Sequence, residues 1–178
     1  MSVPSSTPPR PGGCGHWALG VAFAAAMLGV TIVAPPAPRL VWNMSASAPT
    51  GLYWVRPRAR LTRGVTVIAR LPGAYRRLAA VRHYLPENVP LVKRVAGMAG
   101  DRVCAQGKDI LLNGRRVAER RPVDAAGRTM PWWQGCQVLA RRQVFLLMAD
   151  VPGSFDGRYF GLSDKTEVIG TARLIWAR

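Results

Sequence analysis

The chain has few residues of the kinds that hold metals or build histidine-based active sites. Its 178 residues include only two histidines, His16 and His83, and three cysteines, with no Cys-x-x-Cys pair and no Cys/His cluster at metal-ligand spacing. This scarcity argues against a zinc site and leaves little material for a histidine-based triad. We therefore expect no metal and no cofactor.

Two of the cysteines lie in the body of the chain. If that body is exported to an oxidising compartment, Cys104 and Cys136 could pair as a disulfide closing a long loop. Two buried free thiols are the alternative, and the spacing does not decide between them.

Acidic residues and lysines are also scarce. Nine Asp and Glu stand against 25 Lys and Arg, which gives a formal net charge of +16. This balance suits nucleic acid, anionic lipid headgroups or an acidic partner equally well, so charge alone selects no partner. Only Lys93, Lys108 and Lys165 are lysines, and only Lys93 lies inside an apolar run, residues 89–96.

Charge is absent altogether from residues 17–34. As a helix this segment would span about 27 Å at 1.5 Å per residue, close to the roughly 30 Å of a bilayer core. We expect a disordered cytoplasmic tail at 1–16, a retained transmembrane anchor at 17–34 and a Pro-rich spacer at 35–42. A cleaved signal peptide or a buried core helix stays open.

Residues 43–178 have room for one globular domain. Short apolar runs separated by Gly and Asn turns predict a mainly β fold, a barrel or folded sheet rather than a parallel βαβ domain. Residues 73–84 are the one good candidate for a soluble helix, and Asn113-Gly114 is a strong hairpin signal. The predicted strands cover 51–55, 65–69, 92–95, 101–105, 110–112, 117–118, 137–139, 144–148 and 169–176.

A run of mostly small residues leads into the first of these strands. Ser45 and Ser47 alternate there, and Pro49 and Gly51 predict a turn that would hold one hydroxyl outward. Such a hydroxyl suits a nucleophile, although an ordinary serine-rich surface loop has the same composition.

A serine nucleophile needs a base, and Lys93 is the only lysine placed to be buried. Neutralising an unperturbed lysine at pH 7 costs about 4.6 kcal/mol, and burial can lower a lysine pKa by up to about 3 to 5 units, which covers that cost. A serine-lysine dyad is a known form of nucleophilic catalysis. The alternative is a strand residue whose ammonium extends to solvent.

Three motifs occur in order: S-x-S-x-P-x-G-L-Y, L-V-K-R-V-A-G-M-A-G-D-R-V and S-F-D-G-R-Y-F-G. In these the chain resembles the bacterial signal peptidase I superfamily. The resemblance is closer to the TraF-type peptidases of conjugative transfer systems, which share N-x-S-x-S-x-P-x-G-L-Y and Y-L-P-x-x-x-P-L-x-K. It runs from about Asn43 to the C-terminus and implies a signal-peptidase-like folded sheet.

The resemblance also implies roles for residues of this chain. Ser47 would be the nucleophile and Lys93 the general base, while Ser45 would offer its hydroxyl to the oxyanion alongside the Ser47 amide. The residues that match the last motif are Ser154, Asp156 and Arg158. The serine and aspartate would orient the lysine and the arginine would brace the aspartate; a purely structural Asp/Arg pair is the alternative.

The chain departs from the general signal peptidase pattern at three places. Those enzymes place the serine three residues before the proline, where this chain has Ala46, so Ser47 depends on the TraF comparison and Ser45 is the alternative nucleophile. Gly64-Val65 replaces the usual Gly-Asp, and residues 149–152 replace the Gly-Asp-Asn that often opens the last motif.

Together these features predict a membrane-anchored serine endopeptidase with its catalytic domain on the periplasmic side of the bacterial inner membrane. The resemblance implies a pilin precursor as substrate, cleaved and possibly cyclised for conjugative pilus assembly, with lipid and other transfer proteins as partners and no nucleic acid. The alternatives are a general leader peptidase, or a non-catalytic basic scaffold or nucleic-acid-binding module of a secretion channel.

Overall fold

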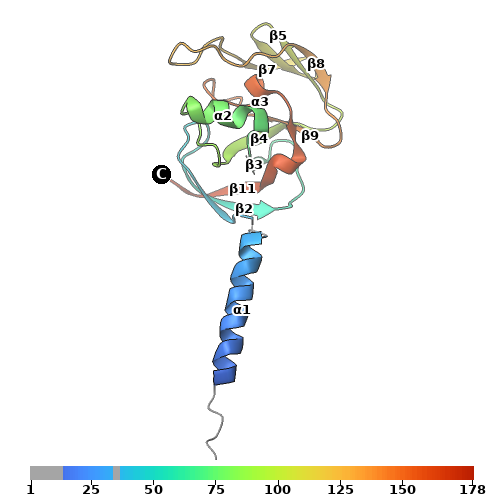
Figure 1. The fold of residues 1–178 in the computed structure, drawn as a ribbon. Helices are drawn as coiled ribbons and strands as arrows, with labels where there is room; N and C mark the ends of the chain where they lie inside the picture. Colours follow the sequence, from blue (N-terminus) through green and yellow to red (C-terminus); the bar gives the residue numbers. More distant parts are fainter. Residues whose placement is uncertain (1–13, 34–36) are drawn as a thin grey trace, which may run out of the picture. The chain divides into compact units, whose positions relative to one another are not determined.

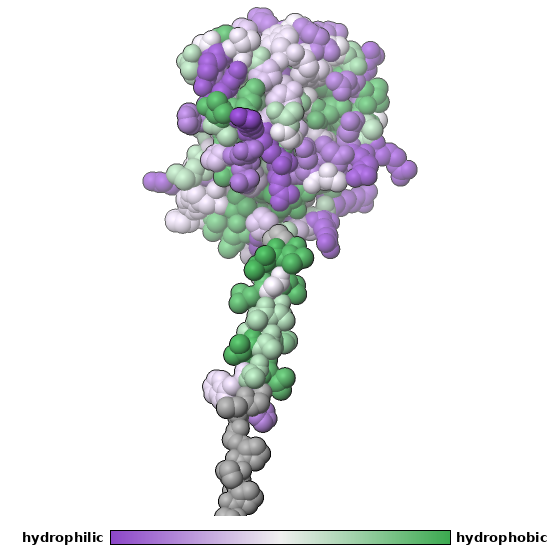
Figure 2. Space-filling view, viewed as in Figure 1, coloured by the Kyte–Doolittle hydropathy of each residue, from purple (hydrophilic) through white to green (hydrophobic). Residues whose placement is uncertain are grey.

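The computed structural model describes residues 14–33 and 37–178, which belong to two compact units divided after Ala37. The first unit contains helix α1, Cys14–Val33. Its His16–Val33 segment is long and apolar enough to cross a membrane, and none of it is buried. Figure 2 shows this helix as a predominantly apolar surface. The helix therefore begins within the predicted tail, whose residues 1–13 lie outside the described part of the chain, as do residues 34–36.

The second unit, Pro38–Arg178, contains two sheets in which all neighbouring strands are antiparallel (Figure 1). The seven-stranded sheet has the order β1-β2-β11-β3-β4-β9-β10, and the four-stranded sheet has the order β7-β6-β5-β8. The four strands of the second sheet lie between β4 and β9 in the chain, so this sheet is an insertion into the first.

The element bounds are as follows. The larger sheet contains β1 (Leu40–Asn43), β2 (Gly51–Pro57), β3 (Thr66–Ala69), β4 (Leu91–Gly97), β9 (Gln143–Leu147), β10 (Ser163–Asp164) and β11 (Val168–Ala177). The smaller sheet contains β5 (Arg102–Gln106), β6 (Asp109–Leu112), β7 (Arg115–Glu119) and β8 (Gly135–Val138). The helical elements of this unit are α2 (Gly73–Val81), α3 (Gly157–Phe160) and the 3₁₀ turn η1 (Lys165–Glu167).

Strand β4 lies in the interior of the larger sheet and is covered on both faces. Leu91 and Val95 pack into one apolar cluster together with Ala79 of α2, whereas Val92 packs into a second cluster on the opposite face. Because successive side chains of a strand alternate between faces, Lys93 shares the face of Leu91 and Val95. A strand that reads as a continuous apolar run therefore carries one amine into the core.

The predicted mainly β architecture is confirmed, with differences at particular elements. Leu40–Trp42, expected at the end of the spacer, belong with Asn43 to strand β1, because this segment pairs in register with β2. Helix α2 ends at Val81 rather than residue 84, since His83 adopts a φ of 57° through which a helix cannot continue. Helix α3, η1 and β10 have no counterpart among the predicted elements.

Candidate active site

Ser47 lies in the loop that connects β1 to β2. The Ala48 N–H donates to the Ser45 carbonyl over 3.4 Å, which closes a turn with Ala46 and Ser47 at its corner. Gly51 ends this loop with a φ of 143°, and a Cβ there would lie 2.0 Å from the Trp176 carbonyl oxygen of β11. The loop is therefore short and tightly joined to the sheet at its end.

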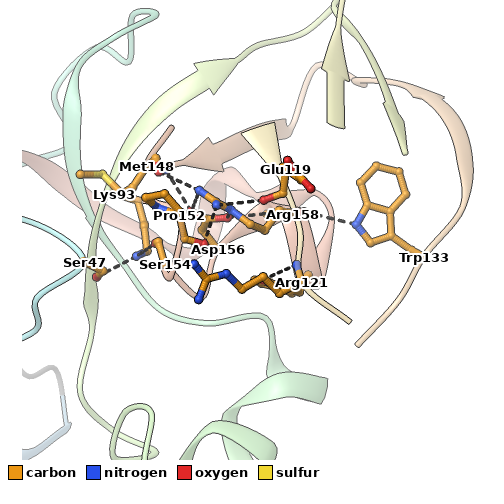
Figure 3. Close-up of polar contacts among 12 residues, drawn as sticks. Ser47, Lys93, Glu119, Arg121, Trp133, Met148, Pro152, Ser154, Asp156 and Arg158 are labelled. Carbon is orange, nitrogen blue, oxygen red and sulfur yellow. Dashed lines mark hydrogen bonds and ion pairs between the residues drawn. The ribbon is translucent and has the colours of Figure 1, made fainter. Parts of the chain in front are cut away.

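Lys93 brings its amine from β4 to this turn (Figure 3). Its Nζ lies 2.9 Å from the Ser47 Oγ and 2.7 Å from the Ser154 Oγ, and the residue is 1% exposed. Burial lowers the Lys93 pKa from 10.5 to about 8; the charge of Asp156 opposes this shift and that of Arg158 adds to it. The amine can therefore lose its proton near neutral pH while in contact with a serine hydroxyl.

Ser45 completes a chain of polar groups. Its Oγ lies 2.9 Å from the Ser47 Oγ and also accepts a hydrogen bond of 3.3 Å from the Ser47 N–H. The chain thus runs from Ser45 to Ser47, then Lys93, then Ser154. Among the described residues, no hydrogen bond joins Ser45 to Lys93, so the geometry favours Ser47 over Ser45 as the hydroxyl that the amine can deprotonate.

Asp156 and Arg158 lie beside this chain as a buried ion pair at the start of α3. The Asp156 carboxylate accepts from the Arg158 Nε over 2.8 Å and from the Met148 N–H over 3.0 Å. The guanidinium also donates to the carbonyl groups of Met148, Pro152 and Glu119. Of the two residues predicted to orient Lys93, Ser154 accepts a hydrogen bond from its amine, whereas Asp156 affects the Lys93 pKa through its charge.

A glycine allows α3 to lie close to the sheet. A Cβ at Gly157 would be 2.6 Å from the Phe145 ring and 2.7 Å from the Leu146 carbonyl oxygen. Any larger residue would push the neighbouring Asp156 away from the Met148 amide. Close packing thus explains the first of the two glycines in the last sequence motif, Gly157.

A cleft of about 680 Å³ opens onto Ser47 and Lys93. This volume is within the usual range for sites that bind a small molecule or a few residues of peptide. Most of the lining is apolar and includes Leu71, Leu85, Leu91, Met130, Val151 and Phe155. An extended peptide with small or apolar side chains fits the chemistry of this lining.

One wall of the cleft is residues 121–130, here named the cleft hairpin, which is closed by a bridge between Val123 and Thr129. Asp124 accepts hydrogen bonds from the Tyr84 hydroxyl and, over 2.7 Å, from the Arg128 guanidinium. The Tyr84 bond is the main cause that holds the Asp124 pKa well below its ordinary value. Since Tyr84 follows α2, this contact ties the hairpin to the helix.

The Tyr84–Asp124 contact was not predicted. Tyr84 was expected as the last residue of the predicted helix and as the start of the Y-L-P motif, and Asp124 lies between predicted strands. The Asp-Ala-Ala-Gly sequence, residues 124–127, is the one local signal for this hairpin, because aspartate and glycine favour tight turns.

Cys104 and Cys136 lie directly opposite one another on β5 and β8, and the structure joins their sulfur atoms as a disulfide. The bond is in the smaller sheet, whereas the serine loop connects two strands of the larger sheet. Among the described residues, no group of three or more His, Cys, Asp or Glu side chains could hold a metal ion.

Comparison with known proteins identifies the family of the chain. The family model described as "Signal peptidase, peptidase S26" matches residues 15–177. Two Escherichia coli proteins named "Plasmid transfer protein TraF" are similar to the chain, at 30% identity over 146 residues and 31% over 137 residues. These alignments cover 75% and 71% of this chain and 82% and 76% of the two relatives.

A crystal structure of a signal peptidase I from Enterococcus faecalis V583 matches 64% of this chain and 97% of that chain, with 19% identity and a TM-score of 0.38. The family model and the two relatives carry the assignment on their own. The chain is a serine peptidase that belongs to the S26 signal peptidase family, among its TraF-type members.

Proposed function

We propose that the chain is a serine endopeptidase in which Ser47 is the nucleophile and Lys93 the general base. The observation that carries this proposal is the 2.9 Å approach of the Lys93 Nζ to the Ser47 Oγ by an amine that is 1% exposed. An amine with a pKa of about 8 is a competent base near neutral pH. The Lys93 amine thus has both the position and the pKa that a base for the Ser47 hydroxyl needs.

The proposed reaction starts from the neutral amine, in which the hydrogen bond between the Lys93 Nζ and the Ser47 Oγ can run from serine to lysine. With Lys93 neutral, the Ser47 hydroxyl donates to the Nζ lone pair while an amine N–H donates to Ser154. As the Ser47 Oγ bonds to the substrate carbonyl carbon, its proton passes to Lys93. Lys93 then returns that proton to the leaving amine as the peptide C–N bond breaks, which leaves an ester on Ser47.

The ester is released by a second nucleophile. Water, deprotonated by Lys93, would give hydrolysis. An amine of the substrate itself would give a cyclic product if it outcompeted water for the ester. Both outcomes use the same base and return Ser47 to its starting form.

The Ser45 hydroxyl and the Ser47 N–H are the proposed donors to the oxyanion. In the free protein the Ser47 N–H donates to Ser45 over 3.3 Å, so this amide must turn from Ser45 to the substrate oxygen. Donors of this kind are worth a few kcal/mol in the transition state. Ser45 would bond to the developing charge without leaving the turn.

The proposed substrate is a pilin-like precursor, and the proposed setting is plasmid transfer. The support is similarity to two proteins named for plasmid transfer, each covered over more than two thirds of its length. Maturation of a pilus subunit for type IV secretion would connect a peptidase to that process. Other conjugative transfer proteins and inner membrane lipid are the further proposed partners.

We propose that α1 is a retained anchor and that the catalytic unit faces the periplasm. The length and apolarity of His16–Val33 support the anchor. The Cys104–Cys136 disulfide supports the orientation, because disulfides persist in the periplasm and are rare in the cytoplasm.

The proposal is tested with a strain that lacks this gene and carries the candidate pilin-like precursor. Ser47→Ala and Lys93→Ala should each abolish processing of the precursor, as measured by mass spectrometry of the subunit, while immunoblots show unchanged amounts in the membrane. Lys108→Ala is the matched control, since this lysine is 70% exposed in an ion pair with Glu119. Processing that survives either active-site change would refute the dyad.

A further inference from the structure

Asn43 lies at the base of the loop that carries Ser47. It is the last residue of β1 and pairs in register with Gly51, the first residue of β2. The loop between them contains both Ser45 and Ser47. Asn43 is only 7% exposed, and the proposed reaction gives it no part.

Within the described part of the chain, all hydrogen bonds of the Asn43 side-chain amide are with this loop. Its Nδ2 donates to the carbonyl oxygens of Ser45, Ala48 and Pro49 over 3.0, 3.2 and 3.0 Å. Its Oδ1 accepts from the Ser45 N–H over 3.1 Å. A primary amide has two N–H groups, so at least one proton is shared between two carbonyl oxygens.

These contacts hold both ends of the turn that presents Ser47. Ser45 and Ala48 are the first and last residues of that turn, and the same amide nitrogen bonds to both. The Tyr53 hydroxyl adds a bond of 2.8 Å to the Pro49 carbonyl, farther from the turn. Fixing both ends of a turn fixes its corner, which is where the nucleophile lies.

We propose that Asn43 is a positioning residue that sets the Ser47 hydroxyl at hydrogen-bonding distance from the Lys93 amine. The inference rests on the proposed Ser47/Lys93 dyad. Catalysis depends on geometry at this level, since a displacement of about 1 Å can cost on the order of 100-fold in rate. Without the amide, the inward-facing carbonyl groups would have to find other donors, and the turn would move to reach them.

The choice of asparagine follows from the acceptors. All three carbonyl oxygens accept from the amide nitrogen, so a carboxylate of the same size would repel them. Alanine would remove all three bonds and leave Ser45 only the Ala48 N–H and Pro49 only the Tyr53 hydroxyl. A serine keeps one donor on a shorter side chain. The number of side-chain donors therefore falls from two in asparagine to one in Asn43→Ser and to none in Asn43→Ala and Asn43→Asp.

The experiment uses the full-length protein in detergent micelles and a fluorogenic peptide that spans the cleavage position of the pilin-like precursor. For Asn43→Asp and Asn43→Ala we expect kcat to fall on the order of 100-fold, with KM nearly unchanged because the apolar lining of the cleft outside the serine turn is intact. Asn43→Ser should recover part of kcat. Melting temperatures and near-ultraviolet circular dichroism show that each variant compared is folded at the assay temperature.

Tyr53→Phe is the matched control, because it removes one bond to the same loop and leaves all those of Asn43. Its kcat should fall far less than that of Asn43→Ala. Equal falls in kcat for the two variants, or a full kcat in Asn43→Ala, would overturn the positioning role. A fall in kcat/KM that came from KM alone would also overturn it.

Failure of this inference is distinguishable from failure of the dyad. If Ser47→Ala and Lys93→Ala abolish cleavage of the peptide while Asn43→Ala and Asn43→Ser keep full kcat, the dyad stands and Asn43 has no positioning role. If Ser47→Ala retains activity, the dyad fails, and the role of Asn43 fails with it.

Discussion

Lys93 is a single residue in which the demands of stability and catalysis oppose each other. Its pKa is about 8 in the folded chain against 10.5 for an ordinary lysine, and each pKa unit corresponds to 1.36 kcal/mol. The buried amine therefore costs the fold about 3 kcal/mol at pH 7. The same low proton affinity leaves part of the amine neutral near pH 7, as the proposed general base requires.

The first prediction concerns the pH dependence of the reaction. Because the neutral amine is the working form, kcat/KM should rise with pH through a midpoint near the Lys93 pKa of about 8 and then level off. The measurement is initial-rate kinetics with the fluorogenic peptide from pH 5.5 to about 9.5, with folding monitored at each pH. A flat profile over this range would contradict a lysine base.

The second prediction concerns stability. Lys93→Met should abolish activity and raise the free energy of unfolding at pH 7 by about 1 to 3 kcal/mol, since it replaces a buried amine by an apolar side chain of similar length. Chemical denaturation at several pH values provides the measurement.

The pH dependence of that stability difference has a definite sign. Between pH 8 and 10.5 the unfolded wild-type chain binds a proton at Lys93 that the folded chain has lost, so wild-type stability rises with pH in this window. The advantage of Lys93→Met should therefore be greatest below pH 8 and shrink toward pH 10.5. An advantage that did not change with pH would mean that Lys93 is not the group that titrates.

At the scale of elements, the cleft depends on a contact between the cleft hairpin and the end of α2. Asp124 is the central acceptor, bonded to Tyr84 and to Arg128. Arg128 also donates to the Arg82 carbonyl group over 3.1 Å, which adds a second tie to the same segment. The wall of the cleft that the hairpin forms is therefore held to the end of α2 by polar contacts.

The third prediction follows from this contact. Asp124→Asn or Tyr84→Phe should loosen the hairpin and raise KM for the peptide several-fold, while kcat changes little because Ser47 and Lys93 are untouched. Asp150→Asn is the matched control, because Asp150 forms an ion pair with Arg94 in which both side chains are exposed. A loss confined to kcat would contradict a role for the hairpin in binding.

The fourth prediction concerns the smaller sheet. Cys104 and Cys136 are separated by 32 positions, and closing a loop of this length is worth about 3 to 4 kcal/mol in the chain-entropy model. Replacing both cysteines by serine should increase hydrogen exchange in the edge strand β8 while the exchange of β3 and β4 changes little. Equal loss of protection in both sheets would show that the disulfide supports the whole unit.

Elements were predicted correctly where a local sequence signal and the tertiary pairing favour the same structure. Asn113-Gly114 joins β6 to β7 with positive φ at both residues, as that dipeptide favours in a hairpin. Strand β1 and the end of α2 were not predicted, because Leu40–Asn43 follow a proline-rich segment and the turn at His83 has no local signal.

The site could be predicted in part. The apolar neighbours of Lys93 indicate its burial, and family resemblance indicates which serine it faces. The contact between Tyr84 and Asp124, residues separated by 40 positions, could not be predicted from local pattern. The four contacts of Asn43 depend on the path of the whole loop, so the motif contains the residue without indicating what it does.

At the scale of the whole molecule, the features that bear on membrane association occur in both units. The apolar α1 helix is one. The other is a group of exposed apolar side chains on the adjacent strands β1, β2 and β11 and in the serine loop: Leu40, Met44, Trp54, Ile175, and the contacting Trp42 and Trp176. Tryptophan is enriched at membrane interfaces, and the net charge of +16 would add attraction to anionic lipid.

The fifth prediction concerns this surface and the orientation. Trp42→Ser combined with Trp176→Ser should lower processing of the membrane-bound precursor more than cleavage of the soluble peptide.

A periplasm-dependent reporter such as alkaline phosphatase, fused after Arg178, should be active. A fusion that worked only with a cytoplasmic reporter would overturn the proposed orientation.

The central claim is that the Ser47 hydroxyl, deprotonated by Lys93, forms a covalent ester with the substrate. The most direct measurement is mass spectrometry of the full-length protein quenched with acid during turnover, with the acyl group mapped by proteolysis. We expect the mass of the acyl portion of the substrate on Ser47, and no adduct in Ser47→Ala or Lys93→Ala. An acyl group on Ser45, or turnover by Ser47→Ala, would contradict the account.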